Sequence, residues 1–332
     1  MSDHRHRILV GLAAFALICL VAVSLTRGSY SLGMGDLADL LGQDGGDEMV
    51  RNILFEIRMP RILLAVLCGM AMALSGTVLQ VLTHNPLAAP GLVGVEAGAG
   101  LSVLIAMILL PSNIAVGFYP LAALTGGIAV ALTIAGLAWG QGISALRLLL
   151  VGVGVTALLG AISDLLITYG QIERVESALL WLSGSLHRAD WAQVHAQAIW
   201  LLISGVPVLL LARQFDLFQL GESVAGSRGL DIRRFQIVAL ILSVMLTASA
   251  VANVGMMSFI GLLAPHAARL LVGERQTVLL PLAALIGGGI VLLGDTIGRT
   301  AVAPLQIPAG LVVAIIGAPY LLFLLSRKGR VS

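Results

Sequence analysis

Residues 62–82 read ILLAVLCGMAMALSGTVLQVL, a run that contains no charged side chain. A helix needs about 20 predominantly apolar residues to cross the hydrocarbon core of a bilayer, and this run is long enough. Its apolar residues do not alternate with polar ones, which favours a membrane helix over a strand of a transmembrane barrel. The run therefore predicts a transmembrane helix, and comparable runs recur along the chain.

The composition extends this prediction to the whole chain. Of the 332 residues, 58% are hydrophobic and 11% are charged, and the mean hydropathy is +1.02. Soluble domains carry about 25% charged residues, so a chain this apolar needs lipid as its solvent. The sequence predicts an all-α, polytopic membrane protein with about ten transmembrane helices, at residues 8–26, 62–82, 92–110, 115–138, 147–168, 195–212, 236–254, 259–272, 278–297 and 308–325.

The distribution of basic residues predicts the orientation. No long polar linker divides the chain, so we expect one transmembrane domain over residues 1–332, with both termini on the same side. Most basic residues fall on that side: Arg5, Arg7, Arg147, Arg213, Arg228, Arg233, Arg234, Arg269, Arg275, Arg327, Lys328 and Arg330. Fewer fall on the other: Arg27, Arg51, Arg58, Arg61, Arg174, Arg188 and Arg299. Since cytoplasmic loops carry the excess of Lys and Arg, we expect cytoplasmic termini in the inner (cytoplasmic) membrane.

Several functions are disfavoured by what the sequence lacks. A phosphate-binding loop requires a lysine after a glycine-rich turn, and the single lysine, Lys328, lies in the C-terminal tail. Neither a cluster of cysteines and histidines nor a Ser-His-Asp set predicts a metal site or a catalytic centre. The near balance of 19 basic and 17 acidic residues argues against nucleic acid as a partner. We interpret Asp164 and Asp295 as the acids within spans. Two acids are few for the intramembrane charge relay that an ion-coupled secondary carrier needs.

Four segments carry a more specific signal when they are taken in order. They are RMPR at 58–61 with Gly69, Gly76 and Gln80; NPLAAPG at 85–91; LGE at 220–222 with Ala225 and Gly229; and FIGL at 259–262 with Pro265, His266, Arg269, Gly294, Asp295, Arg299 and Pro319. Together, over residues 51–325, they resemble the permease subunits of type II ABC importers, the FecCD family of ferric-siderophore, haem and vitamin B12 uptake.

The resemblance implies a fold, a set of partners and a mechanism. It implies a type II ABC importer permease fold, paired with a second permease protomer that is identical or related. It also implies two cytoplasmic ATPase subunits, which bind ATP and Mg, and a periplasmic substrate-binding protein. The chain itself is expected to bind no cofactor and to form no covalent bond with its cargo. Transport would proceed by alternating access.

The resemblance also assigns roles to three groups of residues. Arginines at the positions of Arg58, Arg61 and Arg299 face glutamates of the binding protein in similar permeases, which predicts docking; anchoring at the membrane interface is the alternative. The loop 213–235 resembles the element that couples the permease to the ATPase, as two short helices around a glycine turn. Its candidate coupling residues are Leu220, Gly221, Glu222, Ala225 and Gly229, with Glu222 capping the first helix and Gly229 ending the second. An ordinary basic loop is the alternative.

The third group is a candidate pathway or gate. Asn85 and Pro86 form either a gate or a structural turn. The span 147–168 contributes Gly152, Thr156, Ser163 and Asp164, which either line the pathway or allow tight helix packing. Trp181 is placed near the pathway mouth or at the membrane interface. Around Asp164 and Trp181 the sequence looks most like ferric-siderophore members, so an iron chelate is the expected cargo; haem or cobalamin is the alternative within the family, and an ion-coupled secondary carrier is the alternative outside it.

Overall fold

The computed structural model describes residues 3–28, 33, 47–109, 112–138, 145–302 and 305–328. Within these ranges the regular structure is helical, as predicted. The segment 27–61 between the first two predicted spans is described only in part. Asp36, Asp39 and Asp44 of that segment, and Arg330 of the tail, lie outside the described residues.

The elements follow one another in this order: α1 (Asp3–Thr26), α3 (Glu48–Asn52), the π-helical turn η1 (Ile53–Arg58), α4 (Met59–Leu82), the 3-10 turn η2 (Pro90–Val93), α5 (Val95–Leu109), α6 (Ser112–Ala138), α7 (Ala145–Tyr169), α8 (Ile172–Leu182), α9 (Trp191–Trp200), the π-helical turn η3 (Leu201–Gly205), α10 (Val206–Leu210), α11 (Ala212–Phe218), α12 (Glu222–Ser227), α13 (Ile232–Val254), α14 (Ile260–Val272), α15 (Gln276–Thr300) and α16 (Ala309–Lys328).

A helix occurs at each of the ten predicted spans. Seven helical segments are long and apolar enough to cross a membrane, and three shorter apolar helices lie at Val95–Ile108, Ile260–Val272 and Ala309–Leu322. These segments match the ten predicted spans in order. The helix α8 lies between the predicted spans 147–168 and 195–212.

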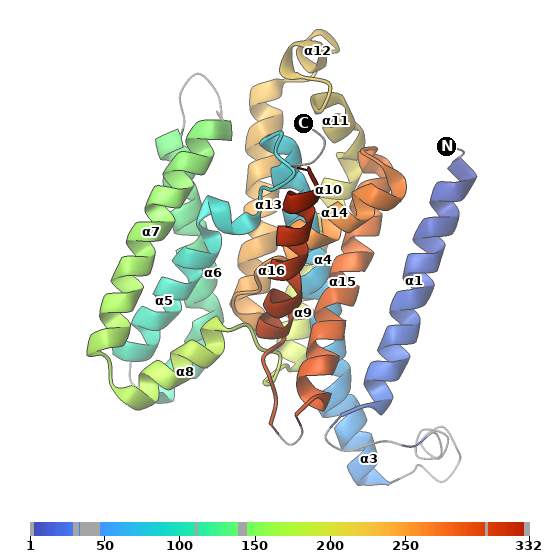
Figure 1. The fold of residues 1–332 in the computed structure, drawn as a ribbon. Helices are drawn as coiled ribbons and strands as arrows, with labels where there is room; N and C mark the ends of the chain where they lie inside the picture. Colours follow the sequence, from blue (N-terminus) through green and yellow to red (C-terminus); the bar gives the residue numbers. More distant parts are fainter. Residues whose placement is uncertain are drawn as a thin grey trace.

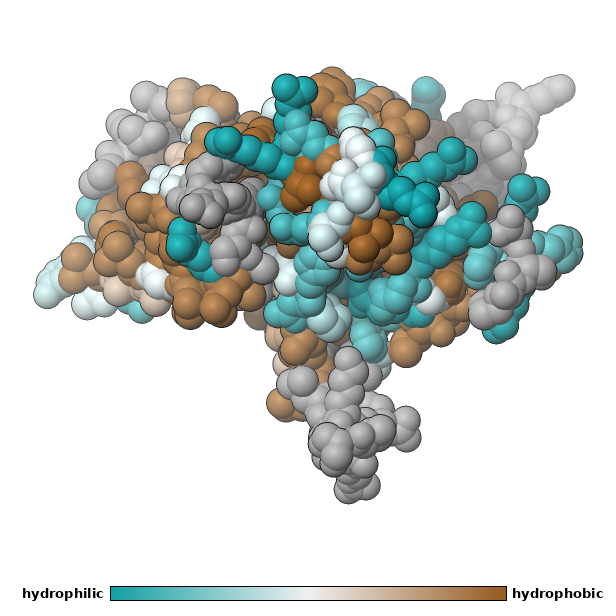
Figure 2. Space-filling view, turned by 90° about the horizontal axis from the view of Figure 1, so that it is seen from above, coloured by the Kyte–Doolittle hydropathy of each residue, from teal (hydrophilic) through white to brown (hydrophobic). Residues whose placement is uncertain are grey.

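Two ends of the bundle can be distinguished in Figure 1. The start of α1, the end of α16, and the short helices α11 and α12 lie at the top, which we call the termini end. The helices α3 and α8 and the connection between α15 and α16 lie at the bottom, which we call the α8 end. Figure 2 looks down on the termini end and shows hydrophilic residues over its middle, with hydrophobic residues around the flanks. This pattern is that of a bundle whose sides face lipid and whose termini end faces water.

The helix α4 forms the centre of the bundle. Over its apolar window 78% of the residues are buried, and it packs against α13, α14 and α15. Glycines allow these close approaches, since a Cβ at Gly69 would collide with the backbone of Gly287 and a Cβ at Gly76 with the backbone of Gly261. The glycines of the 58–80 segment are therefore explained by helix crossings.

The helix α7 stands apart from this core. It lies at one flank of the bundle beside α5 and α6, and only 6% of its apolar window is buried. Large apolar side chains, including Leu150, Val153, Leu158 and Leu165, are exposed on it. Its outer face is thus left for lipid or for another protein chain.

Candidate functional site

The three predicted docking arginines lie together at the α8 end. Arg58 closes η1, Arg61 stands in the first turn of α4, and Arg299 lies in the last turn of α15. Their exposed fractions are only 4%, 8% and 4%. A residue that anchors a helix at the membrane interface extends its side chain toward the headgroups, so burial inside the bundle disfavours the anchoring alternative.

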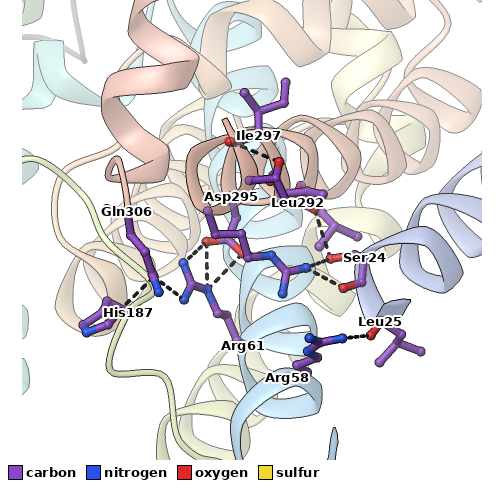
Figure 3. Close-up of polar contacts among 12 residues, drawn as sticks. Ser24, Leu25, Arg58, Arg61, His187, Leu292, Asp295, Ile297 and Gln306 are labelled. Atoms are coloured by element: carbon purple, nitrogen blue, oxygen red, sulfur yellow. Dashed lines mark hydrogen bonds and ion pairs between the residues drawn. The ribbon is translucent and has the colours of Figure 1, made fainter. Parts of the chain in front are cut away.

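Asp295 holds Arg61 through a two-pronged contact (Figure 3). Arg61 donates from Nε to Oδ1 and Oδ2 of Asp295 at 2.9 Å and 3.0 Å, and from NH2 to Oδ1 at 2.7 Å. Its NH1 donates to Oε1 of Gln306 at 2.9 Å, and Nδ1 of His187 lies 3.0 Å from the same oxygen. One side of the guanidinium group is therefore occupied by a carboxylate from within the chain.

Arg58 and Arg299 tie the cluster to the end of α1. Arg299 donates from NH2 to the Ser24 carbonyl oxygen at 2.6 Å and also to the Ser24 hydroxyl. Its Nε lies 3.7 Å from Oδ2 of Asp295. Arg58 donates from NH1 to the carbonyl oxygen of Leu25. The three arginines thus join the ends of α1, α4 and α15.

Sequence reasoning did not place Asp295, Gln306 and His187 in this cluster. Asp295 and Arg299 are four residues apart on α15, a spacing that puts both side chains on one face of a helix. That spacing was the available signal for a pair. Gln306 and His187 belong to connections far apart in sequence, so no local pattern could have identified them.

The predicted coupling residues form a helix–turn–helix at the termini end. Gly221 has φ +104° and separates α11 from α12, and Gly229 has φ +88° just after α12. The placement of Gly229 at the end of the second short helix is correct. Leu220 is exposed beside the turn, whereas Ala225 is buried beneath it.

The expected role of Glu222 is wrong. It does not cap the first short helix; it opens the second, and its Oε1 accepts a hydrogen bond of 2.9 Å from Nε2 of Gln236 on α13. The reason is that Gln219, Leu220 and the positive-φ Gly221 lie between the end of α11 at Phe218 and Glu222. The first turn of a helix is the place where a carboxylate is favoured by the helix dipole.

The candidate gate at Asn85 and Pro86 lies next to the coupling turn. Oδ1 of Asn85 accepts from the Leu87 amide at 2.9 Å, so Asn85 stabilises the turn that follows α4. Asn85, Pro86 and Leu220 line one cavity of about 530 Å³. The same cavity is bordered by Arg269, which donates to Glu274 at 2.9 Å and to Gln80 at 3.0 Å. The structure therefore brings the gate candidates and a coupling candidate together.

The pathway candidates lie along α7. Gly152 is buried, and Thr156 is half-buried with an Oγ1 that has no hydrogen-bond partner among the described residues. Oγ of Ser163 donates to the Leu159 carbonyl oxygen of its own helix. Asp164 is exposed. A Cβ at Gly154 or Gly160 would meet no atom within 4 Å, so these glycines do not serve helix packing within this chain.

Trp181 lies on α8 and is half-buried. It packs against a cluster that includes Ala99 of α5 and Val251 of α13. Its backbone carbonyl approaches Gly255, where a Cβ would collide with it. Trp181 therefore contributes to packing between α8 and the bundle, and its position relative to a pathway mouth stays a prediction.

Glu96 is an acidic residue within a span that the sequence reasoning overlooked. It lies in the first turn of α5, inside the predicted span 92–110, and borders a cavity of about 260 Å³ with Met72, Pro90 and Phe259. A Cβ at Gly91 would lie 3.3 Å from its Oε2. The signal was present, since any acid inside an apolar span is a candidate functional residue.

The described residues contain no group of three or more His, Cys, Asp or Glu side chains that could hold a metal ion. The candidate site therefore consists of a buried arginine cluster at one end, a helix–turn–helix at the other, and an exposed helix face between them. This arrangement defines a polytopic helical membrane protein with a distinct polar site at each end.

Comparison with known proteins identifies the kind of membrane protein. The FecCD transport family model matches residues 16–327. The achromobactin transport system permease protein CbrC of Dickeya dadantii is 36% identical over 96% of this chain and 91% of its own length. The hemin transport system permease protein HmuU of Yersinia pestis is 37% identical over 97% of this chain and 96% of its own length.

A solved structure agrees with these relatives. A metal-chelate type ABC transporter in an inward-facing conformation superimposes with a TM-score of 0.86 at 29% identity, over 97% of this chain and 99% of that chain. The chain belongs to the FecCD transport family. It is the permease subunit of an ABC importer, in which a separate ATPase subunit hydrolyses ATP. The ion-coupled carrier is thereby set aside.

Proposed function

We propose that this permease imports an iron chelate, with a ferric siderophore as the first candidate, by alternating access. The family membership over residues 16–327 carries the proposal. The achromobactin and hemin relatives are almost equally similar to the chain, so overall identity does not choose between a siderophore and haem. Haem or cobalamin is therefore the second candidate cargo.

The proposed orientation places the termini end in the cytoplasm and the α8 end outside. It rests on the excess of basic residues at the ends of helices on the termini side. On this orientation the arginine cluster faces the compartment from which a binding protein delivers its cargo. Arg58, Arg61 and Arg299 are the proposed contacts for carboxylates of that protein, because guanidinium groups bind carboxylates in a two-pronged geometry.

At the opposite end, the α11–α12 unit is the proposed contact for the ATPase. Two ATPase subunits, which bind ATP and Mg, would each receive one such unit from a pair of permease protomers. Leu220 lies exposed at the turn and also lines the cavity of Asn85 and Pro86. A displacement of the turn can therefore alter the shape of the candidate gate directly, without a long chain of intermediate contacts.

The second protomer is proposed to pack near the exposed face of α7. Asp164 supports this placement, because a carboxylate that is exposed on a membrane helix is costly against lipid and needs water or a protein partner. The uncrowded Gly154 and Gly160 are consistent with the same surface. The cargo pathway would then run between the α7 helices of the two protomers, past Thr156 and Ser163.

ATP-dependent uptake in proteoliposomes tests the function. The permease is co-expressed with the ATPase encoded beside it, and the neighbouring binding protein is loaded in turn with ferric siderophores, haem and cobalamin. We expect uptake of an iron chelate that stops when the ATPase partner cannot hydrolyse ATP. Uptake that survives the inactive ATPase would contradict the proposal, and uptake of cobalamin alone would replace the proposed cargo.

A further inference from the structure

Within the arginine cluster, a single carboxylate serves two buried guanidinium groups. Asp295, which is 1% exposed, binds Arg61 with contacts of 2.7–3.0 Å and lies 3.7 Å from Nε of Arg299. That Nε is buried and has no hydrogen-bond partner among the described residues. These three side chains therefore carry one more positive than negative charge.

A buried charge without a counter-ion is costly, so this group favours the arrival of a second carboxylate. An incoming carboxylate would be held best by the two-pronged edge of an arginine. On Arg61 that edge, formed by Nε and NH2, is filled by Asp295. The carboxylate of Asp295 therefore occupies the place on Arg61 that a carboxylate of a docking partner would have to take.

We propose that Asp295 is a positioning residue that stands in for a carboxylate of the binding protein, keeps Arg61 and Arg299 retracted, and gives up Arg61 when that protein docks. The inference rests on the proposed function, in which these arginines contact the binding protein. It adds that docking is an exchange of carboxylates. The exchange weakens docking, lets the binding protein leave after delivery, and frees the end of α4 from α15.

Removing the charge of Asp295 has opposite consequences under the two readings of its role. If Asp295 competes with the partner, Asp295→Asn releases Arg61 and strengthens docking. If Asp295 only stabilises the fold, the same variant leaves two buried arginines without a counter-ion and weakens docking together with assembly. The direction of the change in docking affinity therefore separates the two roles.

The first arm of the test measures whether Arg61 is released. The complete permease–ATPase complex in lipid nanodiscs is treated with phenylglyoxal, and modification of Arg61 is followed by peptide mass spectrometry. We expect slow modification in the wild type and modification about tenfold faster in Asp295→Asn, as for the loss of a charge-assisted hydrogen bond. Arg188, which is exposed, is the internal reference and stays unchanged. Unchanged modification of Arg61 would overturn the proposal.

A second variant tests the proposal if Asp295→Asn does not assemble with the ATPase. Asp295→Asn combined with Arg299→Gln restores the original net charge of the group and leaves Arg61 without its carboxylate. We expect fast modification of Arg61 in this double variant as well. Gln306→Ala is the matched control, since it removes the contact at NH1 and leaves the contact with Asp295.

The second arm measures docking of the binding protein encoded beside the permease. We expect Asp295→Asn to lower the Kd about tenfold, and to have no effect in a chain that also carries Arg61→Gln. Released Arg61 with unchanged or weaker docking would overturn the exchange. The single variant Arg61→Gln separates a failure of the proposed docking role from a failure of the carboxylate exchange. If Arg61→Gln leaves the docking affinity unchanged, the docking role fails. If it weakens docking, the docking role stands and only the exchange is in question.

Discussion

Glu96 places a carboxylate deep within the membrane-spanning part of the bundle. It shares a cavity with Met72, which precedes the end of α4 by about 15 Å of helix, or about half the hydrocarbon thickness. None of the described residues donates a hydrogen bond to its carboxylate. An acid at this depth destabilises the fold unless something compensates it, and such residues are retained for function.

Replacing Glu96 by Gln is therefore expected to separate stability from transport. The substitution removes a buried charge that accepts no hydrogen bond from a described residue and is favoured only by its place in the first turn of α5. Because burial costs more than the dipole returns, the free energy of unfolding should rise by about 1 kcal/mol and the Tm by about 2 °C. Chelate uptake should fall several-fold. Thermal unfolding and uptake are measured on the same preparations.

The matched control is Asp216→Asn. The carboxylate of Asp216 accepts a hydrogen bond of 2.5 Å from the backbone N–H of Gln276, so neutralising Asp216 should lower the Tm. A lower Tm for Glu96→Gln, as for the control, would mean that Glu96 has a structural partner and would remove the argument for a functional carboxylate.

At the scale of helices, the crossing of α4 and α14 depends on two facing glycines. A Cβ at Gly76 would collide with the backbone of Gly261, and backbone cannot move aside as a flexible side chain can. Gly76→Ala should therefore destabilise the fold by about 1–3 kcal/mol and lower the yield of folded protein. Gly289→Ala on α15 is the control, because a Cβ there meets nothing within 4 Å. Equal Tm values for the two variants would contradict the crossing.

The second prediction at the scale of helices concerns the turn between α11 and α12. Gly221 has φ +104° and ψ 148°, a conformation that is essentially restricted to glycine. Gly221→Ala should strain the turn by about 1–3 kcal/mol and reduce the amount of chelate transported per ATP hydrolysed.

The control for this turn is Gly226→Ala in the adjacent helix α12. There the nearest atom to a new Cβ is 4.0 Å away, and the backbone is helical. We expect wild-type coupling in Gly226→Ala. A ratio of transport to hydrolysis that is unchanged in Gly221→Ala would show that the turn does not transmit the motion of the ATPase.

The sequence predicted the spans well and the side-chain network poorly, for one physical reason. Apolar runs are local, and a helix that crosses lipid must satisfy its backbone within its own segment, so each span can be identified from its own residues. The contact of Arg61 with Asp295 joins residues 234 positions apart. The error at Glu222 had a different origin: the sequence predicted the glycine turn but not that α11 ends at Phe218, which leaves Glu222 at the start of α12.

At the scale of the whole molecule, the proposed pairing of two protomers depends on the exposed face of α7. A surface that exposes Leu150, Val153 and Leu158 suits lipid, but the same helix exposes Asp164 and leaves Gly154 and Gly160 without neighbours. At 3.6 residues per turn these positions share one side of α7, so the apolar side chains flank the glycines and Asp164. Such a mixed surface resembles those through which membrane helices associate by small residues. The N-terminal helix α1 is also largely exposed, yet it carries no acid between Ile8 and Thr26.

Thiol cross-linking compares these two surfaces directly. In a chain whose native Cys19 and Cys68 are replaced by Ala, we expect Gly154→Cys or Gly160→Cys to yield a covalent dimer with a short bismaleimide in native membranes. Gly11→Cys on α1 is the matched control, since it is another glycine where a Cβ meets nothing within 4 Å, and it should stay monomeric. Dimers from Gly11→Cys without dimers from α7 would place the second protomer against α1. Asp164 would then have to face water inside a single chain, and the pathway between two α7 helices would be wrong.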